Sequence, residues 1–113
     1  MVLHITEVCT TPLLVRNKEP YHWAHGTTYG AEVILVEVLT GDGVKGYGES
    51  IASPDSAGVE AFIRTAARHL VGQSVFDSRQ AMRRCYHALF QAHGTCSAPR
   101  FGGQILAGLE MAM

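Results

Sequence analysis

The segment from Ala31 to Leu39 reads AEVILVEVL and is the densest run of β-branched and aliphatic residues in the chain. Such a run predicts a β-strand. The dipeptide Asp42-Gly43 follows it almost at once and is a strong signal for the tight turn of a β-hairpin. The chain is therefore expected to contain an antiparallel sheet built around this hairpin.

The strand that completes the hairpin is predicted over Val44 to Glu49. Its two bulky residues, Val44 and Tyr47, do not share one face of a regular strand, because side chains alternate along a strand. We therefore expect a twist or a bulge near Gly46 or Gly48.

The segment before the hairpin predicts one more strand and then a long loop. Apolar and polar residues mix from Leu3 to Thr11, and Pro12 marks the expected end of that strand at a sheet edge. From Arg16 to Gly30 the sequence has no helix or strand period. Loops of this length are usually functional or disordered, and the aromatic residues in this one argue against disorder.

Three helices are predicted after the hairpin. The first ends near Gly72, and its apolar stripe consists of Val59, Phe62, Ile63, Ala66 and Leu70. The second begins at Asp77, with Gln80 completing a capping-box-like start, and ends at Gly94. Its apolar face consists of Ala81, Met82, Cys85, Leu89 and Phe90. Strands followed by helices predict an α+β fold, in which three helices pack on one face of a small, three-stranded antiparallel sheet.

The third predicted helix begins near Gly102 or Gly103 after a loop that contains Pro99. Gln104 and Glu110 are its only polar residues, so it is apolar on almost every side. It also carries no stop signal before Met113. We therefore expect this helix to need more protein around it and after it, and to leave an apolar patch exposed otherwise.

Composition excludes several classes of function. The net charge is −1 and the basic residues are scattered, so nucleic-acid binding has no electrostatic footprint. No signal peptide and no membrane-spanning run is present in the sequence. The cysteines, Cys9, Cys85 and Cys96, are odd in number and widely spaced. A disulfide framework is therefore not expected, and the reducing cytoplasm is the predicted location.

The sequence assigns no catalytic residue and no metal ligand. Residues Gly41 to Gly46 match the pattern G-x-G-x-x-G, but no helix follows to bind a pyrophosphate, so the hairpin interpretation is favoured. His22 and His25 are close in sequence, yet they have no cysteine or acidic partner at the spacing of a zinc site. No paired carboxylates, Ser/His/Asp set or Cys/His pair can be brought together from sequence.

Two segments remain as candidates for contact with a ligand. The first is the aromatic cluster of Tyr21, His22, Trp23 and His25, which suits a mobile loop that covers a ligand. The alternative is that Trp23 packs down as an anchor, and the sequence leaves both open.

The second candidate begins at Glu49-Ser50, where Glu49 is a general base if it is buried. The favoured alternative is that Glu49 caps a turn, with Ser53 and Asp55 beginning the next helix.

The order of these motifs resembles one family. The hairpin segment Ile34 to Ser50 (ILVEVLTGDGVKGYGES), the leading strand Ile5 to Val8, Gly72 between the helices and the closing segment Gly102 to Met113 follow the same pattern. Together they are similar to the N-terminal capping domain of the mandelate racemase/muconate-lactonizing group of the enolase superfamily. The resemblance covers nearly the whole chain.

The resemblance implies a domain that closes over the mouth of a (β/α)8 barrel. In the family, that barrel holds Mg²⁺ on three carboxylates and uses Lys or His to remove the proton α to a substrate carboxylate. Two segments of this chain, Arg16 to Gly30 and about Glu49 to Asp55, would then shape the pocket. The implied substrate contacts are Tyr21, His22, Trp23, His25, Glu49, Ser50 and Ser53.

The barrel itself has no counterpart in the sequence, which is therefore expected to be one capping domain over residues 1–113. Without the metal and the bases, the chain alone is expected to be inactive and to need no cofactor of its own. Its expected partners are the barrel, a small carboxylate substrate and further copies of itself. The alternative is a stand-alone α+β module that binds a small ligand or assembles into a homo-oligomer.

Overall fold

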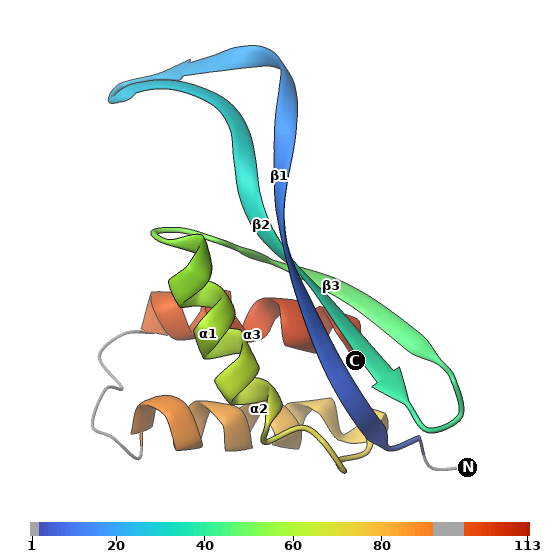
Figure 1. Ribbon diagram of the computed structural model, residues 1–113. Helices are drawn as coiled ribbons and strands as arrows, with labels where there is room; N and C mark the ends of the chain where they lie inside the picture. Colours follow the sequence, from blue (N-terminus) through green and yellow to red (C-terminus); the bar gives the residue numbers. More distant parts are fainter. Residues whose placement is uncertain (1–2, 92–98) are drawn as a thin grey trace.

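The computed structural model describes residues 3–91 and 99–113, and in these ranges the strands come first and the helices after them (Figure 1). The strands are β1 (Ile5–Trp23), β2 (Gly26–Thr40) and β3 (Lys45–Ile51), and they form an antiparallel sheet in the order β1-β2-β3. The helices are α1 (Ser56–Ala67), the 3-10 turn η1 (Val75–Asp77), α2 (Ser78–Tyr86), the π-helical turn η2 (His87–Gln91) and α3 (Pro99–Ala112). The predicted α+β class and element order are confirmed.

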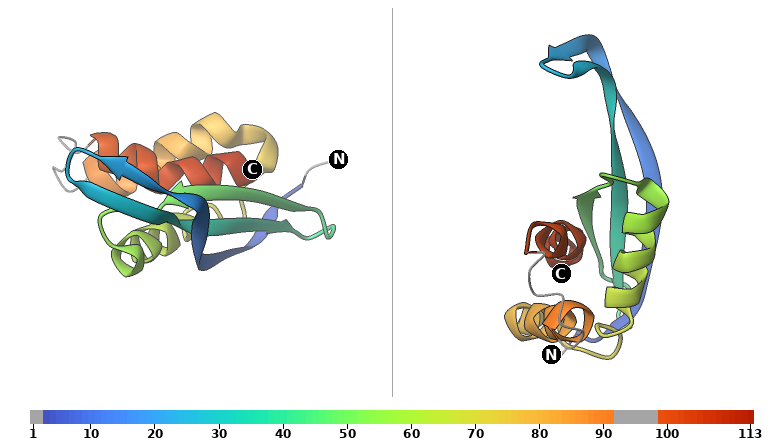
Figure 2. Two further views of the ribbon diagram at one scale, coloured as in Figure 1. Left: turned by 90° about the horizontal axis from the view of Figure 1, so that it is seen from above. Right: turned by 90° about the vertical axis from the view of Figure 1, so that its left-hand side faces the viewer.

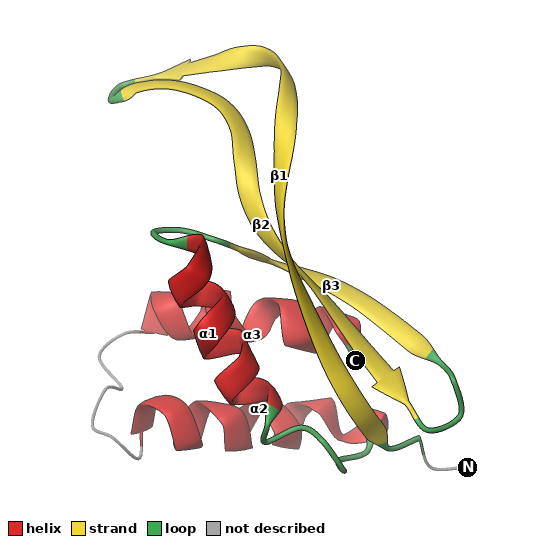
Figure 3. Ribbon diagram, viewed as in Figure 1, coloured by secondary structure: helices red, strands yellow, loops and turns green. Residues whose placement is uncertain are grey.

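The helices lie on one face of the sheet, and the core fills the space between (Figure 3). Ile34, Val36 and Val38 of β2 point to this inner face and are almost fully buried. The helices contribute buried side chains at helical spacing, namely Val59, Ile63 and Ala66 from α1, Ala81 and Cys85 from α2, and Ile105 and Leu109 from α3. Burial of these aliphatic side chains is the main force that holds sheet and helices together.

The predicted turn between β2 and β3 is confirmed. Gly43 has φ +82°, a left-handed conformation that glycine adopts without strain. The Gly43 N–H donates to the Thr40 carbonyl over 3.1 Å, and the Thr40 N–H donates to the Val44 carbonyl over 3.0 Å. The glycines of the G-x-G-x-x-G match therefore belong to a hairpin rather than to a nucleotide-binding loop.

The bulge expected near Gly46 or Gly48 is wrong, because β2 and β3 pair without a register shift. Glycine is needed at both positions because helix α3 packs closely against them. A Cβ atom on Gly46 would lie 1.8 Å from the Ala112 carbonyl oxygen, and one on Gly48 would lie 2.1 Å from the Gly108 carbonyl oxygen. The backbone of α3 thus sits directly on the inner face of β3, where no side chain fits.

The prediction that β1 ends near Thr11 and that Arg16 to Gly30 form a loop is wrong. β1 continues through Pro12 to Trp23 and pairs with β2 along its length, with register shifts between Ile5 and Glu7 and between Arg16 and Tyr21. Because the side chains from 11 to 27 are all exposed, no face needs apolar residues and the alternating pattern is lost. Pro12 is tolerated because its nitrogen faces the open edge of the sheet, where no donor is required.

Residues 14–32 form a two-stranded extension beyond the end of β3, which we call the hairpin arm. The arm rises away from the helices and bends over at its far end (Figure 2). It gives the molecule an elongated shape, with principal extents of 48 × 36 × 19 Å. A two-stranded ribbon is only marginally stable in water, so the arm is a segment that gains from contact with other protein.

Helix α3 begins at Pro99, earlier than predicted, and is better covered than its sequence suggests. Ile105, Leu109 and Ala112 are buried against the sheet and the other helices. The Met111 side chain is 61% exposed. The chain's own sheet and helices therefore supply part of the cover that this helix was expected to need, while the Met111 side chain stays exposed.

The boundaries of α1 and α2 differ in detail from those predicted. Asp55 caps α1 by accepting a hydrogen bond from the Gly58 N–H over 2.9 Å. Gly72, with φ +88°, lies in the turns after α1 and carries the chain back to β1. Asp77 holds the cap position of α2, but its side chain makes no capping hydrogen bond, so the predicted capping box with Gln80 is wrong. Ser74 caps the preceding turn instead.

Several other sequence predictions can be placed. Phe62 was expected in the apolar stripe of the first helix, but it is 42% exposed because it lies at the margin of the buried face. The predicted helix end at Gly94 lies outside the described residues, as does Cys96. None of the described helices combines the length and hydropathy needed to cross a membrane.

The buried thiol of Cys85 gives the stability a pH dependence that can be measured. Burial raises the pKa of Cys85 to about 11, opposed weakly by Arg84. Between the unfolded pKa of about 8.5 and the folded value, the unfolded chain loses this proton first. We expect unfolding free energy to fall with rising pH there, by at most about 1.4 kcal/mol per pH unit, and to be unaffected by this group below that window.

Urea titrations at a series of pH values check this expectation. The variant Cys85→Ala should show a flatter pH dependence than the wild type across the same window. Equal slopes in the two proteins would show that Cys85 does not ionise on unfolding in the expected way.

Candidate functional site

The two candidate segments lie on the same side of the molecule. Residues 21–25, which we call the tip, end the hairpin arm. Residues 49–55, which we call the rim, comprise the end of β3 and the segment that leads from it to α1. The views in Figures 1 and 2 agree that both segments are on the side toward which the arm bends. The fold therefore presents the tip and the rim in one direction, although they lie far apart along the chain.

The tip is an ordered cluster of exposed rings. Trp23 donates from Nε1 to the Thr28 hydroxyl over 3.0 Å, and His22 Nδ1 lies 3.0 Å from the Thr27 hydroxyl. The ring of His25 meets that of Trp23 edge to face, with centroids 5.2 Å apart. Trp23 is 52% exposed, so it is not a buried anchor. Threonines of the facing strand hold the rings while leaving their faces open.

Tyr21 is also exposed and sits opposite Thr28 in the register of the arm. The tip thus offers a phenol, an indole and two imidazoles, with no carboxylate among them. Such a group can contact an apolar or aromatic ligand and can hydrogen-bond a polar one.

In the rim, Glu49 and Ser50 have different roles. The Ser50 side chain is 2% exposed, and its hydroxyl accepts a hydrogen bond from the Gly108 N–H over 2.9 Å. Ser50 therefore fastens β3 to α3. Glu49 points the opposite way and is exposed, so the idea of a buried general base at Glu49 is wrong in this chain. Asp55 caps the start of α1, as expected of a residue that begins the next helix.

Gln104 of α3 is a positioning residue that the sequence analysis missed. Its Nε2 donates to the Ile51 carbonyl over 2.8 Å and also to the Ser53 carbonyl. The rim is tied to the sheet as well, because the Ala52 N–H donates to the Glu32 carbonyl over 3.1 Å. The available signal was a lone amide on an otherwise apolar helix, which indicates a buried or half-buried polar contact.

Loss of the hydrogen bonds from the Gln104 side chain to the Ile51 and Ser53 carbonyls should loosen the rim. In Gln104→Ala we expect the Ala52 amide to exchange with deuterium about tenfold faster, the equivalent of one lost hydrogen bond. Gln104→Glu should act alike, since it keeps the shape of the side chain but not the N–H donor. Exchange followed by NMR is the measurement, and Glu110→Gln, an exposed change on the same helix, is the control that should leave Ala52 unaffected.

A small hollow lies beneath the rim, between β3 and α3. It has a volume of about 260 Å³ and is lined mainly by apolar surface, from Glu49, Ser50, Ile51, Gln104, Ala107 and Met111. Its size suits part of a ligand or a side chain of a packing partner rather than a complete substrate pocket.

The described residues provide no set of ligands for a metal ion in this region. No group of three or more His, Cys, Asp or Glu side chains in ranges 3–91 and 99–113 comes together in a way that could hold a metal ion. Glu49 and Ser53 are exposed side chains on a rim, and the tip carries no acid. A magnesium ion therefore finds no set of carboxylate ligands in the described part of the chain.

A family model and several solved structures match this chain. The family described as "Mandelate racemase / muconate lactonizing enzyme, N-terminal domain" matches residues 5–113. The mandelate racemase/muconate lactonizing protein from Herpetosiphon aurantiacus is 26% identical, with a TM-score of 0.79, and the match covers 99% of this chain and 30% of that one. No curated protein matches.

Two further solved structures share the fold. A member of the enolase superfamily from Polaromonas sp. JS666 is 25% identical, with a TM-score of 0.80, and the match covers 96% of this chain and 28% of that one. The dipeptide epimerase from Enterococcus faecalis V583, solved with Mg and the dipeptide L-Leu-L-Tyr, is 22% identical, with a TM-score of 0.69, over 78% of this chain and 26% of that one. This chain thus spans about 30% of the length of such relatives.

Proposed function

This chain belongs to the mandelate racemase/muconate lactonizing enzyme family as its N-terminal domain, and we propose that its function is to cap a catalytic barrel and shape the ligand pocket at the barrel mouth. The single observation that carries the proposal is the shared direction of the tip and the rim (Figure 2). Two separate segments that face one way can enclose a ligand between themselves and a third surface.

The tip is proposed to contact the ligand through Tyr21, His22, Trp23 and His25. All four rings are exposed, and those of His22 and Trp23 are held by cross-strand hydrogen bonds. Little side-chain entropy is therefore lost at these two residues when a ligand is covered. Side chains 14–27 of the arm are exposed, so little packing holds the arm to the rest of the fold and it can open and close.

The rim is proposed to supply the second set of contacts, through Glu49 and Ser53. Ser50 is proposed to position the rim rather than to contact the ligand, because its hydroxyl accepts a hydrogen bond from Gly108 of α3. Gln104 holds the rim at a fixed height above the helix. A mobile arm and a fixed rim would together exclude water from the reacting centre.

The chemistry is proposed to belong to the barrel, which by family resemblance supplies Mg²⁺ and the acid–base residues. This chain's own side chains would bind, orient and screen a small carboxylate substrate. The chain alone is therefore proposed to be inactive, and to carry out no step of α-proton abstraction.

A chimera tests the capping proposal. Residues 5–113 would replace the matching segment of the Enterococcus faecalis dipeptide epimerase, and epimerisation of L-Leu-L-Tyr would be followed by NMR. We expect Trp23→Ala to lower kcat/KM about tenfold, mainly through KM, because a ligand contact made in both ground and transition states is lost.

Phe76→Ala is the matched control, since Phe76 is an aromatic residue that is 72% exposed and far from both segments in sequence. It should leave kcat/KM unchanged. If the chimera binds but does not turn over the dipeptide, the same comparison is made on the dissociation constant. Equal values for Trp23→Ala and Phe76→Ala would contradict a role of the tip in ligand contact.

A second candidate function, assembly into a homo-oligomer, is favoured by the outer face of the sheet. Leu13, Val33, Leu35 and Ile51 point to this face, and the described helices cover only the other one. A strand that is apolar on both faces, as β2 is, is typical of a sheet covered on both sides. Sedimentation equilibrium of wild type and Leu35→Lys distinguishes assembly from a monomer.

A further inference from the structure

Strand β1 forms an edge of the sheet, and part of that edge is open. In an antiparallel sheet, successive residues of a central strand bond alternately to the two neighbours. The Glu32 carbonyl bonds to Ala52, so even-numbered residues of β2 bond toward β3. Their partners across the register on β1 include Val8 and Thr10, which therefore direct their N–H and C=O groups away from the sheet.

The open part of the edge is short and bounded at both ends. At one end, Ile5 is already paired, since its N–H donates to Gln73 and its carbonyl accepts from Gly72. At the other end, Pro12 has no N–H to offer. Natural proteins protect edges with bulges and prolines of this kind. Among residues 3–91 and 99–113, no further strand pairs with the stretch between them.

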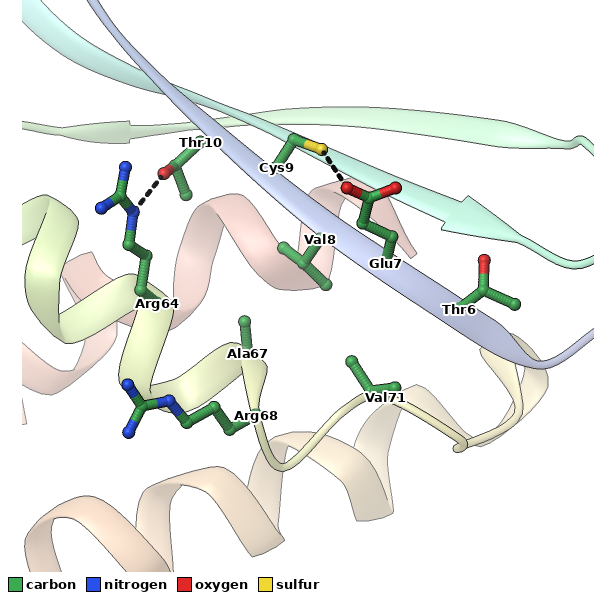
Figure 4. Close-up of a pocket in the computed structure, with 9 residues that line it drawn as sticks. All are labelled: Thr6, Glu7, Val8, Cys9, Thr10, Arg64, Ala67, Arg68 and Val71. Atoms are coloured by element: carbon green, nitrogen blue, oxygen red, sulfur yellow. Dashed lines mark hydrogen bonds between the residues drawn. The ribbon is translucent and has the colours of Figure 1, made fainter.

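A groove runs along this stretch between β1 and the C-terminal half of α1 (Figure 4). Its volume is about 460 Å³, and its walls are the residues 6–10 of β1 on one side and Arg64, Ala67, Arg68 and Val71 on the other. Because five consecutive strand residues line it, the groove exposes the backbone of β1 as well as its side chains.

The helical wall of the groove carries positive charge. Arg64 donates to the Thr10 hydroxyl over 3.1 Å and forms an ion pair with Glu60 at 3.4 Å. Its positive charge is therefore partly neutralised. Arg68 is the C-cap residue of α1, four residues after Arg64, and is exposed. Within the described part of the chain, its guanidinium makes no ion pair and no hydrogen bond.

We propose that this groove binds an extended acidic peptide segment, which pairs with the backbone of Val8 and Thr10 as an added strand and presents a carboxylate to Arg68. Addition of a strand at an exposed edge is a recurring mode of peptide recognition, in which backbone bonds give affinity and side-chain pockets give specificity. Alternate side chains of such a strand point toward α1, where the free charge is positive. The proposal does not depend on the capping function.

The test uses the chain labelled with ¹⁵N and the synthetic peptide acetyl-Val-Thr-Val-Glu-Val-Thr-amide. We expect saturable shifts of the Val8 and Thr10 amide signals, and weaker binding of the same peptide with Lys in place of Glu. A version with N-methyl groups on alternate amides should not bind, because it cannot donate to the edge.

Charge reversal at Arg68 tests whether this side chain binds the carboxylate of the peptide. Arg68→Glu should weaken the Glu peptide about tenfold and strengthen the Lys peptide, as expected for one exchanged charge pair. Arg79→Glu, an exposed arginine on α2, is the matched control and should change neither affinity. The proposal is overturned if the peptide does not bind, if Arg68→Glu and Arg79→Glu behave alike, or if the edge instead pairs with a second copy of the chain.

Discussion

Gly48→Ala is expected to destabilise the chain by about 3 kcal/mol, the upper part of the range for overpacked sites. The added Cβ would lie 2.1 Å from the Gly108 carbonyl oxygen and 2.8 Å from the Met111 Cβ. Both neighbours belong to α3, and the nearer one is backbone, so no side-chain rotation relieves the clash. The whole helix must shift away from β3, and the contacts of its buried residues with the sheet weaken together.

Urea unfolding of wild type and variant measures this effect. Gly103→Ala is the matched control on α3, because no atom lies within 4 Å of its added Cβ. The control should stabilise the chain by about 0.5–1 kcal/mol through helix propensity. If Gly48→Ala were as stable as the wild type, α3 would not rest on β3 at the observed distance.

Leu109→Ala is the second change with a large expected effect. Leu109 is fully buried in α3, in the core cluster that joins the sheet to all three helices. Removal of its side chain should cost about 3 kcal/mol, from lost burial and from the cavity that remains. Met111→Ala, on the same helix, is the matched control, because the Met111 side chain is 61% exposed. It should change the free energy of unfolding by no more than about 0.5 kcal/mol.

Thermal or urea unfolding of the two variants checks the prediction. Similar losses for Leu109→Ala and Met111→Ala would mean that the two faces of α3 are equally buried, which the structure contradicts. A large loss for Met111→Ala alone would point to packing of that side chain against another molecule.

The hairpin and helices were predictable from sequence because their patterns come from burial. The run from Ala31 to Leu39 is a dense stretch of β-branched and aliphatic residues. The apolar stripes of α1 and α2 repeat at the helical period. Asp42-Gly43 adds a local turn signal that does not depend on the rest of the fold.

The hairpin arm was not predictable by the same route. Both of its faces meet solvent in this chain, so no alternation of apolar and polar residues records its strands. Its strand character comes from pairing between β1 and β2, which no single segment reveals. The proline inside β1 misled the prediction further, because only the pairing shows that its nitrogen faces the open edge.

The candidate site also has features that the sequence shows and features that only the packing of the chain reveals. Aromatic residues from Tyr21 to His25 could be recognised as an unusual cluster, but their cross-strand threonine partners could not. The tasks of Ser50 and Gln104 depend on where α3 crosses β3, and the glycines that permit the crossing carry no such information in sequence. Long-range packing therefore determines which rim side chains are buried and which are exposed.

The central claim is that this chain covers and orients a ligand without performing the chemistry. The most direct measurement is ¹H NMR of mandelate and of L-Leu-L-Tyr in D₂O with Mg²⁺ and the purified chain. Loss of the α-proton signal should be no faster than in buffer with Mg²⁺ alone. Mg²⁺-dependent exchange that accompanies the chain and disappears in Glu49→Gln would place a base within these residues and contradict the account.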